Sequence, residues 1–186
     1  LTYTFYDGYG YAGVHAALTA DFSKPQKGNN PYDEPVTTTS AMTKGLVTGT
    51  KVRILGTNDW LTTSTYYNDK GRIIQIVGDN GVGGKDIVTN LYDFNGKLLS
   101  NYQRHQAPRS TLTSETPVLT MLTYDAAGRV DSVKKRLKDD ISLQRTITKN
   151  TYDELGQLKT KRLGVINATK QIERLNYDYN IRGWLR

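Results

Sequence analysis

Few residues in this chain combine the type and the spacing that catalysis or metal binding requires. The sequence contains no Cys and only two His, His15 and His105, which stand far apart in the chain. Neither His has an acidic companion at metal-ligand spacing, so a metal centre or a nucleophile with its base would depend wholly on residues that folding brings together. We therefore expect no metal site, no cofactor and no catalytic residue.

Two further patterns resemble reactive sites only superficially. The glycine-rich segment 78–86 suggests a phosphate loop, but Asp79 stands where its first Gly belongs and Asp86 replaces the Ser or Thr that would hold magnesium. The carboxylates at 33–34 and 139–140 are adjacent in sequence, whereas glycoside hydrolysis needs a pair across the bond. We interpret segment 78–86 as a turn between repeats and the carboxylates as solvated loop residues. The chain is thus not expected to be an enzyme.

Composition excludes some partners and leaves others open. The 186 residues carry a net charge of +7, which favours polyanionic partners. Basic clusters lie at 134–138 and 159–162, but lysines at the edges of a sheet more often prevent edge pairing than bind nucleic acid. Nucleic acid is therefore disfavoured, and anionic or cell-surface carbohydrate remains a possible partner.

No apolar run reaches the roughly 18 residues of a membrane span. Because the chain opens at Leu1 rather than Met and stops at Trp184-Leu185-Arg186, we expect it to be a piece of a longer protein.

The strongest signal is an internal repeat of the form Tyr-(Asp/Asn)-x-x-Gly-(Arg/Lys/Gln)-(Leu/Ile/Val). Its four copies begin at Tyr67, Tyr92, Tyr124 and Tyr152, at spacings of 25, 32 and 28 residues. A variant copy begins at Tyr177 with two extra residues before its Gly, and a degenerate copy covers 6–10. Such lengths suit a hairpin with a variable connection. The repeat residues expected to have a structural role are Tyr67, Gly71, Tyr92, Asp93, Gly96, Tyr124, Asp125, Gly128, Tyr152, Asp153, Gly156, Tyr177, Asp178 and Gly183.

The motif predicts a hairpin turn and its register. The Asp side chain caps a type I turn, and the Gly three residues later adopts the left-handed conformation that a following bulge needs. With three loop residues, Asp93 faces Lys97 on one side of the ribbon, and Tyr92 faces Leu98 on the other. The same offsets apply to the other copies, in which the expected pairs are Asn68–Arg72, Asp125–Arg129, Asp153–Gln157, Tyr67–Ile73, Tyr124–Val130 and Tyr152–Leu158.

These elements predict an all-β fold of antiparallel β-hairpin repeats that form an extended curling sheet. Runs rich in Thr and branched aliphatic residues flank each motif and read as strands. We expect a loop-rich N-terminal segment at 1–60 that leads into repeats at 61–186. Residues 22–45 hold three of the five prolines and read as an irregular, exposed loop. The only helix expected is a short one near 14–18.

The tyrosines fall into two groups according to their place in the repeat. With 13 Tyr against 3 Phe and 2 Trp, most large apolar surface carries a hydroxyl. The motif Tyr reads as a cross-strand packing residue, whereas tyrosines outside that position are the better candidates for stacking on sugars. Those candidates are Tyr9, Tyr11, Tyr66, Tyr102 and Tyr179, of which Tyr66 and Tyr102 are taken as the glycan contacts.

The repeated form resembles the tyrosine-aspartate (YD) repeats of the Rhs family. Segments 44–53, 58–63 and 175–185 are similar to Rhs-repeat cell-surface proteins of Bacteroides-like bacteria. The resemblance implies long curling β-sheets that wrap into a hollow shell, an extracellular or cell-surface location, and a carbohydrate-binding role described for some members. It also makes further repeats of the same polypeptide the expected partners. The carboxylates of the family's later self-cleaving segment and a C-terminal toxin are not recognisable in this chain.

Two functions compete on these grounds. The recurrent residues are those a hairpin needs, which favours a structural part of a shell or scaffold. The alternative is a carbohydrate-binding module at the cell surface. Because a cut repeat sheet leaves open strand edges, we also expect the chain to self-associate.

Overall fold

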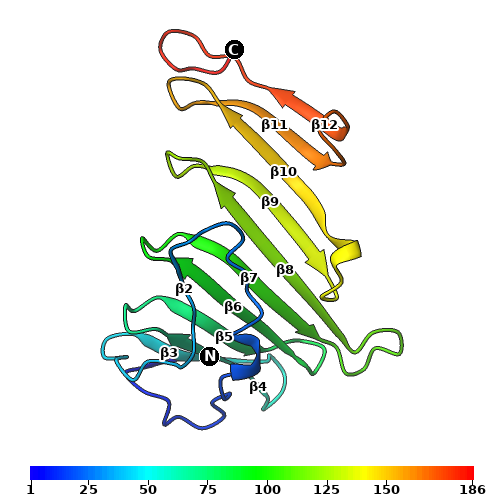
Figure 1. Ribbon diagram of the computed structural model, residues 1–186. Helices are drawn as coiled ribbons and strands as arrows, with labels where there is room; N and C mark the ends of the chain where they lie inside the picture. The colour runs from blue at the N-terminus through cyan, green and yellow to red at the C-terminus, as the bar shows by residue number, and fades with distance from the viewer. The chain divides into compact units, whose positions relative to one another are not determined.

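The computed structural model describes residues 1–186 and shows an all-β chain with antiparallel strand pairing (Figure 1). This confirms the predicted fold class of antiparallel hairpins. Two single 3-10 turns, η1 (Thr19–Asp21) and η2 (Ile141–Leu143), are the only helical elements. The strands are β1 (Thr2–Tyr6), β2 (Asp33–Glu34), β3 (Val47–Arg53), β4 (Trp60–Tyr67), β5 (Ile73–Asp79), β6 (Lys85–Asp93), β7 (Leu98–Gln106), β8 (Glu115–Tyr124), β9 (Val130–Leu137), β10 (Arg145–Tyr152), β11 (Leu158–Val165) and β12 (Gln171–Asn176).

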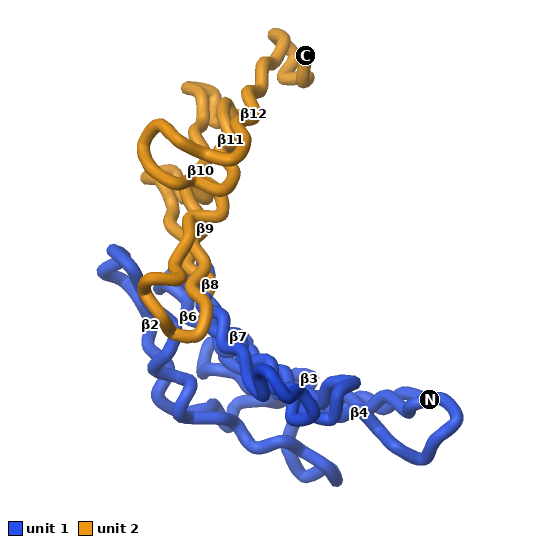
Figure 2. The backbone as a smooth tube through the Cα atoms, turned by 90° about the vertical axis from the view of Figure 1, so that its right-hand side faces the viewer, with its two compact units in different colours: residues 1–119 blue, residues 120–186 orange.

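The strands are hydrogen-bonded in the order β1-β3-β4-β5-β6-β7-β8-β9-β10-β11-β12, and β2 pairs with β6. Contacts divide the chain into unit 1 (Leu1–Leu119) and unit 2 (Thr120–Arg186), shown in two colours in Figure 2. The division falls within β8. It does not coincide with the expected boundary at residue 60, because the first sixty residues supply β1, β2, β3 and the first residue of β4 to unit 1.

The N-terminal segment contains a repeat hairpin with a long insertion in its turn. Tyr6 pairs with Val47, as Tyr92 pairs with Leu98. The Asp7 amide donates to the Leu46 carbonyl (3.1 Å), and Gly45 has a φ of +80°, as the turn Gly of a complete motif does. The degenerate copy at 6–10 is therefore corrected: its closing half is Gly45-Leu46-Val47. Residues 8–44, here called the insertion, lie between the two halves.

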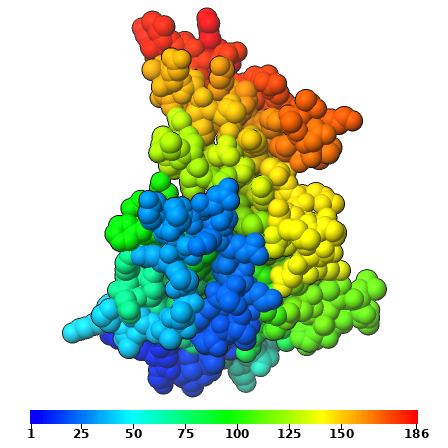
Figure 3. Space-filling model, viewed as in Figure 1, coloured from blue at the N-terminus to red at the C-terminus, as the bar shows by residue number.

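The insertion covers one face of β4–β7. Residues 22–45 are mostly irregular and exposed, as predicted, but Phe22, Ser40 and Thr43 are buried. Phe22 packs with Tyr66, Ile74 and other apolar residues of these strands to form the buried core of unit 1. In the views of Figures 1 and 3 the blue insertion crosses in front of the green strands. The helix expected at 14–18 is also absent, because this stretch is held extended on the sheet through hydrogen bonds to the Leu18 backbone.

Every hairpin that the repeat motif closes and whose register is described carries a bulge, two residues after the position that follows the turn Gly. Tyr67 faces Ile73 and Tyr66 faces Gln75, which leaves Ile74 as the extra residue. The same shift isolates Thr48, Leu99 and Lys159. In unit 1 these bulged residues are buried, with exposed fractions of 0% for Thr48, 0% for Ile74 and 2% for Leu99. In unit 2 Lys159 is exposed.

Candidate functional site

The motif turns have the predicted geometry. In the copy at Tyr92, the Gly96 amide donates to the Asp93 carbonyl and the Asp93 amide donates to the Lys97 carbonyl, both at 2.9 Å. The same two bonds close the turns at Asn68, Asp125 and Asp153. The turn glycines all have positive φ: Gly71, Gly96, Gly128, Gly156 and Gly183. The predicted cross-strand positions of Tyr67, Tyr92 and Tyr152 are likewise confirmed.

The turn carboxylates of Asp93, Asp125 and Asp153 each accept a backbone amide, and Asp125 also binds a cation. Asp125 Oδ1 accepts from the Arg129 amide (2.9 Å), and this bond is the main reason that the pKa of Asp125 lies below its usual value. The Arg129 guanidinium completes the expected pair at 2.7 Å. Arg72 differs from the expectation: its guanidinium binds Glu34 (2.9 Å) and the carbonyl of Asp93 in the neighbouring turn (2.9 Å). The charged side chain therefore links turns as well as closing them.

The motif tyrosines bind backward to the preceding repeat. Tyr92 Oη donates to the Ile73 carbonyl at 2.9 Å, and Ile73 is the residue that faces the preceding motif Tyr. The equivalent bonds are Tyr67 to Val47 (2.6 Å) and Tyr152 to Val130 (2.8 Å). In the copies at Tyr67 and Tyr92, that carbonyl lies directly before the bulge of the preceding hairpin, where the ladder is disrupted, so the hydroxyl supplies a donor at that point. The sequence signal for this bond is the Tyr, rather than Phe, in every copy.

The last copy of the repeat begins at Tyr179, so the expected roles of Tyr177 and Asp178 are wrong. The turn bonds run from the Gly183 amide to the Asn180 carbonyl and from the Asn180 amide to the Trp184 carbonyl, both at 2.9 Å. Tyr179 faces Leu185 and donates to the Leu158 carbonyl (3.0 Å), as the other motif tyrosines do. The copy therefore has the ordinary length, with Trp184 in place of the basic residue.

The two expected glycan contacts are buried, which contradicts that assignment. Tyr66 and Tyr102 have exposed fractions of 6% and 1%. Tyr66 stacks on Tyr9 with ring centroids 4.7 Å apart, and its hydroxyl donates to the His15 carbonyl. Burial raises the pKa of both Tyr9 and Tyr66. The alternation of side chains along a strand does not reveal which face of the sheet the insertion covers. The burial of these two rings could therefore not be predicted from the sequence.

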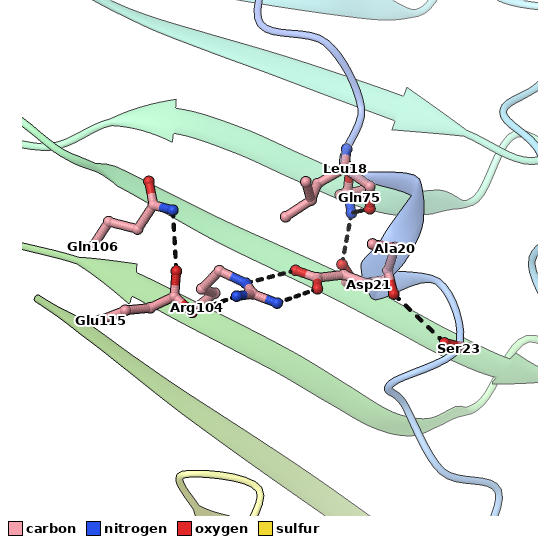
Figure 4. Close-up of polar contacts among 9 residues, drawn as sticks. Leu18, Ala20, Asp21, Ser23, Gln75, Arg104, Gln106 and Glu115 are labelled. Carbon is pink, nitrogen blue, oxygen red and sulfur yellow. Dashed lines mark hydrogen bonds and ion pairs between the residues drawn. The ribbon is translucent and has the colours of Figure 1, made fainter.

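A buried ion network fastens the insertion to the sheet (Figure 4). Asp21, at the end of η1, is fully buried and accepts two hydrogen bonds from the Arg104 guanidinium of β7. The third guanidinium nitrogen binds Glu115 of β8. The bond to Asp21 is the main cause that raises the pKa of Arg104, and burial acts in the opposite direction. Neither the insertion nor the pairing was visible in the sequence, because Asp21 and Arg104 are far apart in the chain.

Neutral side chains hold the insertion backbone beside this network. Gln75 is fully buried; its Oε1 accepts from the Leu18 amide (2.7 Å) and its Nε2 donates to the Leu18 carbonyl (3.0 Å). Ser100 Oγ accepts from the Gln26 amide (2.8 Å). These contacts use the backbone of the insertion, so they depend little on its sequence.

Folding supplies each His with an acidic neighbour but with no third ligand. His15 Nε2 lies 2.9 Å from Asp79 Oδ1, and His105 Nδ1 lies 2.5 Å from Asp86 Oδ1. Ser64 Oγ accepts from the backbone amide of His15 (3.0 Å). No group of three or more His, Cys, Asp or Glu side chains is placed to hold a metal ion.

In unit 1 the insertion covers one face of the sheet. The same face of β10–β12 in unit 2, here called the open face, is not covered by any segment. Lys149, Arg162 and Arg174 stand in register across β10, β11 and β12. A surface cavity of about 680 Å³ lies over Thr160, Arg162 and Arg174. A second cavity of about 700 Å³ is lined by Ile147, Gly164 and Ile172 together with neighbouring residues. The open face thus combines a row of cations with an apolar end.

No protein-family model matches the chain, and no curated protein matches it either. None of the helical elements has the length and apolar character to cross a membrane.

Proposed function

We propose that this chain is a non-enzymatic structural segment of a large secreted or cell-surface Rhs-type repeat protein, in which it builds part of a β-sheet shell or scaffold. The observation that carries this proposal is that the recurrent residues already have structural partners. The Asp and Gly close the turn, and the Tyr both packs across the strand and binds the preceding hairpin. No recurrent residue is left over for a ligand.

The ends of the sheet support an assembly role. β1 and β12 each have one strand partner, so each presents an open edge to which further repeats of the same polypeptide could add. Stability from stacked neighbours is the general principle of repeat proteins. The same edges lead us to expect self-association of this chain, which light scattering over a concentration series measures. A strict monomer at high concentration would argue against open, pairing-competent edges.

A glycan array separates the scaffold from the alternative carbohydrate-binding module. The purified chain is applied at low and at raised salt, because salt screens the nonspecific attraction of its +7 charge. We expect no binding that survives raised salt, and we expect an antibody against the chain to label the surface of intact producing cells. Salt-resistant binding to one defined sugar would contradict the proposal. Turnover of a glycan or peptide, abolished by a single carboxylate substitution, would contradict it as well.

A further inference from the structure

The net charge of the chain is concentrated in unit 2. Residues 120–186 hold 14 of the 25 Lys and Arg and 8 of the 18 Asp and Glu, a net charge of +6, whereas unit 1 has a net charge of +1. Unit 1 neutralises its charges within the fold, as in the Arg104–Asp21 and Arg72–Glu34 pairs. In unit 2 the pair Asp125–Arg129 lies within a single turn. Unit 2 therefore carries an excess of cations over carboxylates.

Three of these cations form the row on the open face. Arg162 donates to Gln171 (3.0 Å) and to the Asn167 carbonyl (2.9 Å), and Arg174 donates to Asn176 (3.1 Å), so both bind neutral groups. Neither Lys149, Arg162 nor Arg174 has a carboxylate within ion-pair distance. Lys149 and Arg174 are exposed. The row can therefore accept carboxylates without first breaking an existing ion pair.

An apolar end lies directly beside the cations. The register between β10 and β11 places Ile147 opposite Gly164. The register between β11 and β12 places Ile172 opposite the same Gly164, on the other neighbouring strand. Gly164 leaves room for Ile172, whose side chain occupies the space that a Cβ would fill. Ile147 is 41% exposed and Ile172 is 83% exposed. A partner that covers large apolar side chains this exposed is stabilised, because burying apolar surface lowers the free energy.

Unit 1 shows how such a face is covered in this fold. Asp21 of the insertion binds the cation Arg104, and the next residue, Phe22, enters the apolar core. Polar side chains at the fourth position after the turn Gly, Gln75 and Ser100, bind the insertion backbone. In unit 2 the same position is Thr160, which lines the cavity beside Arg162. A cation, an apolar site and a polar side chain at this position thus recur on the open face, where the Thr160 hydroxyl hydrogen-bonds Thr151 (2.6 Å).

We infer that the open face of unit 2 is a docking surface for an acidic polypeptide segment in which carboxylates stand next to large apolar residues. The carboxylates bind the row of Lys149, Arg162 and Arg174, and the apolar side chains cover Ile147 and Ile172. A polypeptide is favoured over a sugar because exposed aliphatic side chains, Ile147 and Ile172, form one end of the surface. The aromatic residue beside the row, Tyr152, already has Arg129 over its ring (4.3 Å) and its hydroxyl on the Val130 carbonyl.

Fluorescence anisotropy with the full chain tests this assignment. The probe is a fluorescein-labelled peptide of three Asp-Phe-Ser-Gly repeats, compared with versions in which Asn replaces every Asp or Ser replaces every Phe. We expect the first peptide to bind and each replacement to weaken binding at least tenfold. Lys149→Glu and Arg174→Glu should each weaken binding at least fivefold. Lys161→Glu makes the same charge change on β11 but points to the opposite face, so it should change affinity less than twofold. Circular dichroism verifies that each variant folds.

Other outcomes overturn the inference. Equal binding of the Asp and Asn peptides, or the absence of binding, would show that the row does not select carboxylates. Equal losses in Lys161→Glu and Arg174→Glu would show attraction by net charge alone. A sulfated hexasaccharide that binds more tightly than the peptide, and loses binding in the same variants, would assign the face to carbohydrate instead.

Discussion

Units 1 and 2 share one hairpin design and differ in what lies on one face of it. In unit 1 the first turn has been opened to admit residues 8–44, which return across β4–β7 and bury that face. In unit 2 the turns are short and the corresponding face is open, so Lys159 is exposed where Ile74 and Leu99 are buried. The hairpin therefore specifies register, whereas burial depends on a segment that is not part of the repeat.

The largest expected effect is the loss of the buried cation in unit 1. Arg104→Leu leaves the fully buried Asp21 without its partner, which should lower the free energy of unfolding by about 3–5 kcal/mol. Arg136 occupies the same motif position in unit 2 and donates to Gln144, and no fully buried carboxylate lies in that unit, so Arg136→Leu should cost about 1 kcal/mol. Urea unfolding measures both.

A double variant is the control for this comparison. Asp21→Leu combined with Arg104→Leu removes both buried charges and should recover much of the stability lost by Arg104→Leu alone. Equal losses for Arg104→Leu and Arg136→Leu would contradict the distinction between a covered and an open face.

The turn glycines should matter equally in both units. Gly128 has a φ of +78°, so Gly128→Ala should cost about 1–2 kcal/mol because the left-handed region is unfavourable for a residue with a Cβ. Gly96→Ala, in unit 1, should cost a similar amount. Gly81 has open space around it and no positive φ, so Gly81→Ala should change stability by less than about 0.5 kcal/mol. Thermal unfolding compares the three.

The tyrosine hydroxyls should have a smaller effect that depends on their setting. Tyr67 is 6% exposed and provides the only side-chain donor described at the Val47 carbonyl, so Tyr67→Phe should cost about 1 kcal/mol. The Val130 carbonyl accepts from Asn150 (2.9 Å) as well as from Tyr152, so Tyr152→Phe should cost about 0.5 kcal/mol. Tyr32→Phe, at an exposed position, serves as the control. Equal, negligible changes in all three would mean that the backward bond does not stabilise the repeats.

Alkaline pH should act mildly and on unit 1. Burial raises the pKa of Tyr9, Tyr66, Tyr67 and Tyr92, all in unit 1. Their contribution to stability is complete below the ordinary Tyr pKa of about 10 and falls as the pH rises above it, because the unfolded chain ionises first. Tyrosinate absorbance and near-ultraviolet circular dichroism should change together above about pH 10. Ionisation of these tyrosines at their ordinary pKa without loss of structure would contradict their burial.

Contacts between residues close together in the chain could be predicted from the sequence, whereas contacts between residues far apart in the chain could not. The turn chemistry of Asp93 and Gly96 determined the strand register because all of its atoms lie within five residues of each other. The first hairpin was not recognised because Asp7 and Gly45 are separated by the whole insertion. The burial of Tyr66 and Tyr102 followed from that insertion and not from the strand pattern. The last copy was misaligned because Asp178 matches the consensus better than Asn180, although Asn accepts the same turn bonds.

Hydrogen exchange after removal of the insertion tests the central claim most directly. Replacing residues 8–44 by two alanines restores an ordinary motif, Tyr6-Asp7-x-x-Gly45, so the β1–β3 hairpin should still close. We expect amides of β4–β7 to exchange much more slowly than those of β10–β12 in the parent chain, and to approach the unit 2 rates in the shortened chain. Unchanged protection of β4–β7 after the replacement would contradict the account.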